Sequence, residues 1–183
     1  MERWPEDIRI STERLALEPL TEERLDSTCA YALDAEHIRY MMYLPYASRE
    51  ECLEAIRAAR KQWQAPRPRY YEFALLRGEE HIGGITLYVL PEPHAAELGW
   101  VLHPDHWGQG YMQEAARGLM DRAVQDLGMR RFIAQCDSEN EASRILMERL
   151  GMRFVSRLPG RVSRLLGGER EELTYERIVG DEL

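Results

Sequence analysis

The segment from His103 to Met120, HPDHWGQGYMQEAARGLM, joins a polar loop to an amphipathic helix. Gly108 and Gly110 lie in the loop, and no Ser, Thr, Asp or Asn directly precedes the helix that starts near Tyr111. Side chains of those four types usually accept hydrogen bonds from the first N–H groups of a helix. Uncapped N–H groups that follow glycines can bind an anion such as a phosphate group. The alternative is a tight strand-to-helix turn with water on these groups.

Two common phosphate-binding motifs do not fit this loop. A Walker loop requires Gly-Lys followed by Ser or Thr, and the single lysine of the chain, Lys61, lies far upstream. A dinucleotide fingerprint, GxGxxG, requires glycine where this chain has Gln113. That fingerprint also follows the first strand of a domain, whereas this loop follows four predicted strands.

Three other patterns do not make a complete site. His103 and His106 have the HxxH spacing of a metal-binding pair, but only Asp105 stands nearby as a third ligand, so no metal site is predicted. Ser143 is not preceded by the GxSxG elbow of a hydrolase nucleophile. The three cysteines are odd in number and widely spaced, which favours neither a disulfide framework nor a CxxC metal pair. They are Cys29, Cys52 and Cys136.

Seven strands and four helices must position these residues. Ser48 and Glu51 form a capping box, while Gly128 and Gly151 mark the ends of the last two helices. Strands are predicted at 14–20, 70–76, 81–90, 95–102, 130–137, 152–158 and 171–179. Helices are predicted at 21–34, 48–65, 111–127 and 139–151. Without a repeat or a linker, this order predicts a single α/β domain over residues 1–183 with a mixed sheet.

The charge of the chain excludes one class of partner. With a net charge of −8, the surface repels a phosphate backbone, so nucleic-acid binding is disfavoured and a cationic small molecule or basic polypeptide fits better. The first residues lack the apolar core that is expected of a signal peptide, and no run approaches the roughly 18 apolar residues of a membrane span. We therefore expect a folded cytoplasmic protein that does not bind membranes.

Four segments together resemble one family. They are TERLALEPL, HIGGITL, AELGWVLHPDHWGQGYMQEA and NEASRILMERLGM. This set is similar to the GNAT superfamily of acyl-CoA-dependent N-acyltransferases, in particular the branch of the RimJ and RimL ribosomal-protein N-terminal acetyltransferases. The resemblance covers nearly the whole chain. It implies an α+β GNAT fold with a mixed, largely antiparallel sheet that splays between its fourth and fifth strands, and helices on both faces.

The resemblance also implies a cofactor site for acetyl-CoA, without a metal. The pantetheine arm would contact Asn140 and the backbone of Trp100, Val101 and Leu102, where the fourth strand splays from the fifth. The pyrophosphate would bind the N–H groups of six loop residues: Trp107, Gly108, Gln109, Gly110, Tyr111 and Met112. The family loop often begins with Gln or Arg and ends with a small residue, so Trp107 and Met112 are departures that leave the acyl chain length open.

The chemistry implied is attack of an amine on a thioester carbonyl. By resemblance, the N–H of Val101 or Leu102 would stabilise the oxyanion. Many GNAT enzymes carry a tyrosine acid at the position of Met147, which cannot donate a proton. Ser143, on the same helical face, is the better candidate to support the leaving thiolate, as similar residues do in the RimJ and RimL branch. A hydrogen bond to pantetheine or at the helix start is the other interpretation of Ser143.

Two acids in apolar strand patterns are candidate general bases. Burial could raise the pKa of Glu72, in YYEFALL, or of Glu97, in AAELGW, toward neutrality. Glu72 is the first choice and Glu97 the second. Either could instead lie on a solvated strand face, and a chain of waters would need no dedicated base.

The acceptor remains open at this point. The expected reaction transfers acetyl from acetyl-CoA to a primary amine in a ternary complex, possibly the N-terminal amine of a ribosomal or other basic protein. A small-molecule amine or antibiotic is the alternative, and fold similarity does not choose between them. An acyl-CoA-binding sensor without turnover and a plain interaction domain are hypotheses of other classes. The aromatic stretch 40–46 either lines the acceptor site or packs on the core, and the protein could be a monomer or a homodimer.

Overall fold

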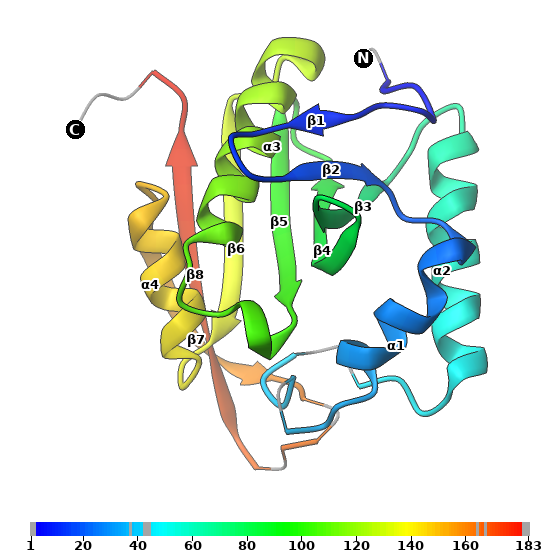
Figure 1. Cartoon of the computed structure of the whole chain (residues 1–183). Coiled ribbons are helices and arrows are strands. Elements are labelled where there is room, and N and C mark those ends of the chain that lie inside the picture. Colours follow the sequence, from blue (N-terminus) through cyan, green and yellow to red (C-terminus); the bar gives the residue numbers. More distant parts are fainter. Residues whose placement is uncertain (1–2, 37, 42–44, 164, 167, 181–183) are drawn as a thin grey trace.

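The computed structural model describes residues 3–36, 38–41, 45–163, 165–166 and 168–180. Its strands form one eight-stranded sheet in the order β1-β2-β3-β4-β5-β6-β8-β7 (Figure 1). Every neighbouring pair is antiparallel except β5 and β6, which are parallel. The strands are β1 Ile10–Ser11, β2 Ala16–Pro19, β3 Tyr70–Arg77, β4 Glu80–Val89, β5 Ala95–Leu102, β6 Arg131–Asp137, β7 Arg153–Arg161 and β8 Arg170–Ile178.

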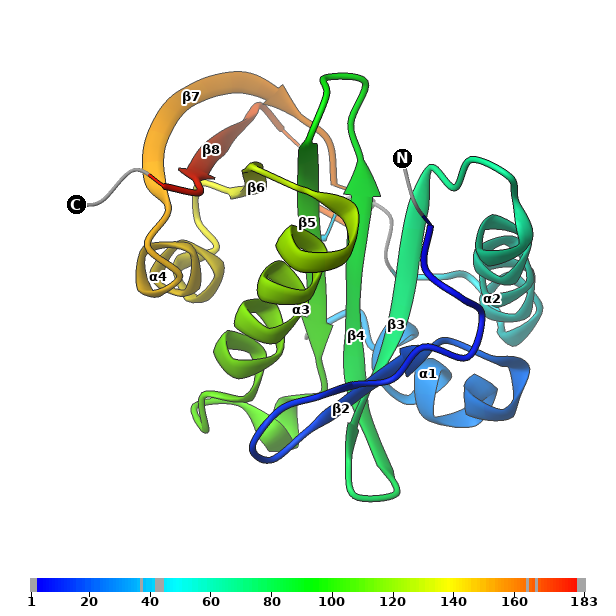
Figure 2. The same ribbon diagram turned by 90° about the horizontal axis from the view of Figure 1, so that it is seen from above.

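The helices cover both faces of this sheet, with α3 and α4 on one face and α1 and α2 on the other (Figure 2). Side chains alternate between the faces along each strand. Phe73 and Leu75 of β3 therefore pack in the core beneath α3, whereas Ala74 and Leu76 pack in a second core beneath α1 and α2. The helices are α1 Leu25–Ala32, α2 Arg49–Gln64, α3 Tyr111–Leu127 and α4 Glu141–Arg149, with 3-10 turns η1 Glu22–Arg24 and η2 Pro104–His106.

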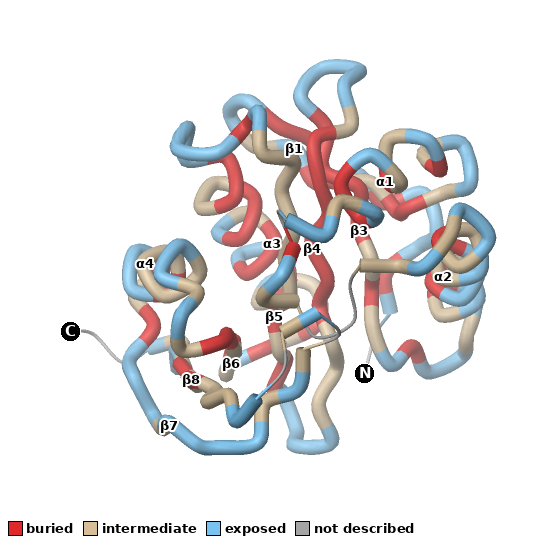
Figure 3. The backbone as a smooth tube through the Cα atoms, turned by 90° about the horizontal axis from the view of Figure 1, so that it is seen from below, coloured by how far each residue is buried: buried red, intermediate tan, exposed pale blue. Residues whose placement is uncertain are grey.

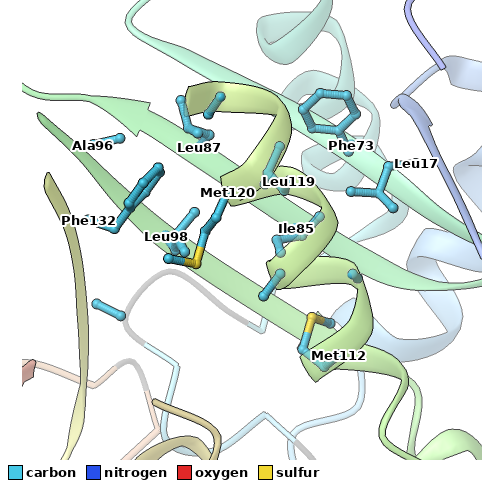
Figure 4. Packing of buried hydrophobic residues seen from close by; sticks show 14 of the residues in the cluster. Leu17, Phe73, Ile85, Leu87, Ala96, Leu98, Met112, Leu119, Met120 and Phe132 are labelled. Atoms are coloured by element: carbon cyan, nitrogen blue, oxygen red, sulfur yellow. The ribbon is translucent and has the colours of Figure 1, made fainter. Parts of the chain in front are cut away.

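Helix α3 is the main contributor to the larger core. Leu119 and Met120 lie over the sheet opposite Ile85, Leu98 and other strand residues (Figure 4). Leu119 is fully buried, so truncation to Ala would destabilise the fold by about 2–5 kcal/mol. Burial is concentrated in β3, β4 and the inner side of α3, whereas β7 is exposed along most of its length (Figure 3). The fold thus holds the start of α3 firmly against the sheet.

The elements differ from the predicted ones mainly at their ends. A short strand β1 precedes β2, and the predicted helix at 21–34 begins as the turn η1 and ends at Ala32. The predicted loop at 159–170 is partly wrong, because Pro159 pairs with Glu171 and Arg161 with Arg170. Proline is tolerated there because β7 is an edge strand, where one N–H group needs no ladder partner.

A gap opens in the sheet between β5 and β6. The two strands pair only from Ala95 to Leu98 and from Arg131 to Ala134. Beyond these residues β5 continues to Leu102 and β6 to Asp137 without pairing to each other. The predicted splay between the fourth and fifth predicted strands is confirmed, and it places unpaired backbone beside the start of α3.

Candidate active site

The start of α3 carries open N–H donors. Gly110, the N-cap residue, has φ 76° and no side chain caps the helix. The first backbone hydrogen bond runs from the Glu114 N–H to the Gly110 carbonyl at 3.0 Å. Within the described part of the chain, the N–H groups of residues 108–113 have no hydrogen-bond partner. These donors converge at the positive end of a helix dipole, which suits an anion.

Trp107 is a correction to the predicted set of donors. Its N–H donates to the Pro104 carbonyl at 3.0 Å, because η2 closes just before the loop. Its indole N–H donates to the Leu102 carbonyl at 2.8 Å. The free donors therefore begin at Gly108, and Trp107 instead fixes the loop to the end of β5.

Gly108 and Gly110 are required by backbone conformation. Gly108 has φ 73°, a region that L side chains rarely adopt, and a Cβ there would meet nothing within 4 Å. A side chain at Gly110 would lie 3.6 Å from Nη2 of Arg14. The left-handed conformations turn the chain, while the open space in front of Gly108 leaves room for a ligand.

Arg14 holds the loop from outside it, a role that sequence reasoning missed. Its Nε donates to Oε2 of Glu114 at 2.6 Å, its backbone N–H to Oε1 at 2.7 Å, and its Nη1 to the Gln109 carbonyl at 3.0 Å. The guanidinium also lies 4.6 Å from the centre of the Tyr111 ring. The only local signal was Glu114, an acid in the first turn of a helix without a capping side chain. We name this arrangement of Arg14, Glu114 and Gln109 the loop clamp.

A second arginine reaches the same helix start. Nη1 of Arg77 donates to the Tyr111 hydroxyl at 3.3 Å, and Arg77 also pairs with Glu80 at 3.1 Å. Two guanidinium groups, from β3 and from the turn after β1, therefore flank Tyr111. Because Glu114 and Glu80 balance these two charges, the positive potential at this end of α3 comes from the helix dipole.

Along β5, the backbone N–H and carbonyl groups of successive residues point alternately toward β4 and toward the gap. Leu90 N–H donates to the Ala95 carbonyl and His103 N–H to the Ile82 carbonyl, so odd-numbered residues of this strand turn toward β4. The N–H groups of Trp100 and Leu102 therefore point toward the gap, because backbone direction alternates along a strand. Val101 faces β4, which corrects the prediction that its backbone is available to the pantetheine arm or to an oxyanion.

Ser143 lies at the gap with a free hydrogen. Oδ1 of Asn140 caps α4 by accepting the Ser143 N–H at 3.2 Å, and the Trp100 indole donates to Ser143 Oγ at 3.3 Å. Since indole is only a donor, Ser143 accepts that bond and its own hydroxyl hydrogen remains available. Met147 is fully buried in the core. Both interpretations of Ser143 stay open, and Asn140 serves at least as a helix cap.

Glu72 is a half-buried residue on the opposite face of the sheet, beneath α1 and α2. Burial raises its pKa to about 7, although a hydrogen bond from the Thr86 hydroxyl lowers it. Within the described residues it has no cationic partner. Its Oε1 would be 3.2 Å from a Cβ on Gly84, which pairs with Val101 of β5. The carboxyl therefore leans toward the strand that borders the gap.

Glu97 shares this face but lies where the gap is closed. It is half-buried, and burial followed by the charge of Glu172 raises its pKa, while Arg161 lowers it. Its neighbours Ala96 and Leu98 point into the core beneath α3, so Glu97 points the other way. Glu97 is opposite Ile133 of β6, within the paired stretch. The structure thus brings both predicted acids to one face. Glu97 lies on β5 at the paired stretch, and Glu72 lies on β3, level with Gly99 where the pairing of β5 with β6 has ended.

The remaining predicted groups do not build a metal centre. Nε2 of His106 lies 3.3 Å from Oε1 of Glu80, while His103 faces Asp105. Among the described residues, no group of three His, Cys, Asp or Glu side chains is placed to hold a metal ion. In the same part of the chain, no helix has the length and apolar character to cross a membrane.

The aromatic stretch is only partly described, because residues 42–44 lie outside the described residues. Met41 and Tyr46 pack against the core beneath α1 and α2. Burial and then the charge of Glu72 raise the pKa of Tyr46, so this ring lies near the carboxyl. Packing on the core is thus confirmed for Met41 and Tyr46, and Tyr46 is also close enough to Glu72 to line a site there.

The open donors and the gap fit a thioester nucleotide such as acetyl-CoA. The N–H groups from Gly108 onward can hold a pyrophosphate, and the gap exposes the strand backbone of Trp100 and Leu102 for an extended arm. No Cβ at Gly108 would be in contact with another residue, so the approach to the loop is open. Ser143 borders the gap on the face of α3 and α4, and Glu72 lies on the opposite face of the sheet, on β3, two strands from β5.

Comparison with known proteins identifies the family of this chain. Residues 14–153 match the acetyltransferase (GNAT) domain. The uncharacterized N-acetyltransferase YnaD of Bacillus subtilis (strain 168) is 36% identical over 80 residues, which span 43% of this chain and 47% of YnaD. The ribosomal-protein-serine acetyltransferase of Escherichia coli (strain K12) is 32% identical over 72 residues, 39% of this chain and 40% of that protein. Both matches span less than half of the relative.

One solved structure shows the same fold over nearly the whole chain. RimL, a ribosomal L7/L12 alpha-N-protein acetyltransferase in complex with coenzyme A, superposes with a TM-score of 0.83. RimL is 20% identical to this chain, and the match covers 96% of this chain and 100% of the RimL chain.

Proposed function

This chain belongs to the GNAT family of acetyl-CoA-dependent N-acetyltransferases, and from that premise we propose that it acetylates a primary amine by direct attack in a ternary complex. The observation that carries the proposal is the set of free N–H groups at the start of α3, beside the gap that Ser143 borders. The N–H groups of Gly108 and its successors bind the pyrophosphate, and the Trp100 and Leu102 backbone aligns the pantetheine arm. Bound acetyl-CoA supplies the activated acetyl thioester.

Glu72 is the proposed general base. With a pKa near 7, its carboxylate can accept a proton from the incoming ammonium, which frees the amine to attack. The N–H of Leu102 faces the gap and is the proposed donor to the oxyanion, in place of Val101. As the new C–N bond forms and the C–S bond breaks, the nitrogen releases its second proton to solvent and the Ser143 hydroxyl donates a proton to the leaving sulfur. Glu72 then returns the proton that it accepted to solvent. The Ser143 proton is then replaced from solvent.

The proposed acceptor is the N-terminal amine of a ribosomal or other basic cytoplasmic protein. A net charge of −8 favours a basic partner, and the partial likeness to a ribosomal-protein-serine acetyltransferase supports this class. A small-molecule amine or antibiotic remains the second candidate within the same chemistry. Met147, in place of a tyrosine acid, is the feature that keeps a non-catalytic acyl-CoA sensor as the alternative of another class.

Calorimetric titration with acetyl-CoA, followed on the same sample by thiol release with a panel of amines and basic peptides, tests the proposal. We expect binding and release, and loss of binding in Gly110→Glu, which places charge and bulk at the free N–H groups. Binding without release would favour the sensor. Absence of binding in the unmodified protein would overturn the proposal.

A further inference from the structure

A cavity of about 710 Å³ lies at the C-terminal end of α4. Its lining comes from α3, α4, β7 and β8, and in Figure 1 α4 and α3 are seen on either side of β8. Four arginines line it: Arg117, Arg149, Arg153 and Arg177. We name this space the arginine cavity.

The two acidic side chains of the arginine cavity are already paired outside it. Oε1 of Glu148 accepts from Arg144 at 2.8 Å, and Oε2 of Glu176 accepts from Arg131 at 2.9 Å. Neither of these arginines lines the cavity. The acids therefore do not neutralise the four lining arginines, and the cavity is a positive site on a chain whose net charge is −8.

The four arginines differ in the contacts that their side chains make. Arg117 and Arg177 each donate, at 2.9 Å, to carbonyls of Arg149 and Leu150 at the end of α4. The side chains of Arg149 and Arg153 have no hydrogen-bond or ion-pair partner among the residues that the structure describes. Their guanidinium groups are therefore free to bind an anion, and substituting them removes no contact within the described chain.

The arginine cavity lies close to the free N–H groups of α3. Arg117 follows Met112 by five residues, which is about 7.5 Å along a helix. Nε2 of Gln113, in the first turn of α3, lies 3.5 Å from the carbonyl of Arg149. A ligand with two separated phosphate groups can therefore reach both places at once.

We propose that the arginine cavity binds a phosphomonoester dianion. A guanidinium fork matches two phosphate oxygens, and free forks bind such groups best. The inference rests on the proposed function for one source of this group, the 3′-phosphate of coenzyme A whose pyrophosphate lies on α3. A separate phosphorylated compound presents the same chemistry and is the other source.

The test compares coenzyme A with 3′-dephospho-coenzyme A by calorimetry, in the unmodified protein and in the double variant Arg149→Gln with Arg153→Gln. The matched control is Arg67→Gln with Arg130→Gln, which removes the same charge from two exposed arginines outside the cavity. We expect the double variant to lose roughly tenfold in affinity for coenzyme A and little for the dephospho form. The control should change neither affinity.

A second arm identifies the source. If the unmodified protein binds both nucleotides equally, but inorganic phosphate raises its melting temperature under saturating dephospho-coenzyme A and does not raise that of the double variant, the phosphate comes from a separate compound. Equal affinities together with no effect of phosphate would overturn the inference. So would an equal loss of both nucleotides in the double variant. Failure of the unmodified protein to bind either nucleotide would instead overturn the proposed function.

Discussion

The role proposed for Glu72 depends on the surroundings of its carboxyl group in the folded chain. The residue is half-buried, and its carboxyl accepts a hydrogen bond from Thr86 and has no cationic partner among the described residues. Burial favours its neutral form, which places its pKa at about 7 instead of the usual range. A base with this pKa changes its charge close to neutral pH.

Glu72→Gln should lower kcat at pH 8 by roughly 100-fold, because general-base assistance is lost. In the unmodified protein kcat should rise with pH through about 7, since only the carboxylate accepts a proton, and this acid limb should be absent in the variant. Rate profiles from pH 5.5 to 9 measure both effects. Glu97→Gln is the matched control and should keep the acid limb. Loss of the acid limb in Glu97→Gln, with the limb retained in Glu72→Gln, would contradict the assignment.

The same pKa has a consequence for stability. The folded state holds the Glu72 proton more tightly than the unfolded chain, whose pKa is near the ordinary 4.5. The unmodified protein should therefore lose stability as pH rises from 4.5 through about 7, relative to Glu72→Gln. Denaturant titration of both proteins at pH 5 and pH 8 measures the difference. An unchanged difference between the two pH values would show that Glu72 is not held in a buried, neutral form.

Ser143→Ala separates the two interpretations of the serine hydroxyl. As a donor to the leaving sulfur, Ser143 should contribute to kcat, so the variant should lose roughly 10- to 100-fold in kcat while KM for acetyl-CoA changes little. Trp100→Phe keeps the hydroxyl but removes the indole donor, and it should have a smaller effect. A change confined to KM would show that Ser143 only binds the cosubstrate.

At the scale of elements, the turn after β1 and the first turn of α3 act together through the loop clamp. Glu114 accepts hydrogen bonds from Thr12 and Arg14, and Arg14 also donates a hydrogen bond to the Gln109 carbonyl. Fixing this carbonyl fixes the orientation of the next peptide N–H, which belongs to Gly110. The loop is thus arranged for an anion before the anion binds.

Arg14→Ala should raise KM for acetyl-CoA by roughly tenfold with little change in kcat, because the loop must then be ordered by the ligand. Glu114→Gln should also raise KM for acetyl-CoA. Arg14→Lys should raise it by a smaller factor, because a single ammonium group replaces the guanidinium and cannot make all of its hydrogen bonds. Steady-state kinetics with a fixed acceptor measures this. Arg9→Ala, which removes a charge from an exposed ion pair, is the control, and an equal effect there would show that charge alone matters.

At the scale of the whole molecule, the sheet separates the groups proposed to bind the cosubstrate from the proposed base. Ser143 and the free N–H groups of α3 lie with α3 and α4, whereas Glu72 lies beneath α1 and α2. A cosubstrate and an acceptor can therefore approach from opposite faces. The net charge of −8 acts on the acceptor over a longer range than any single contact.

The molecular charge predicts a preference among peptide acceptors. A peptide with basic residues after its N-terminal amine should have a higher kcat/KM than an acidic peptide of equal length. Its kcat/KM should fall several-fold between about 50 and 300 mM salt, because screening weakens long-range attraction. Thiol-release assays over this range test the point. Equal rates for the two peptides would favour a small-molecule acceptor.

The sequence by itself determined most of the elements, although not β1 or the ends of β7 and β8. It also determined the uncapped start of α3, the net charge and the types of the candidate acids, because these follow from local pattern and composition. Tertiary structure decided which groups are free and where they meet. Arg14 reaches Glu114 across 100 positions of the chain, and the arginine cavity joins four elements. Trp107 and Val101 proved to be committed elsewhere because η2 and strand register use their backbone groups. Burial and pairing depend on residues distant in the sequence, so local patterns could name Glu72 and Ser143 but could not place them on opposite faces of one sheet.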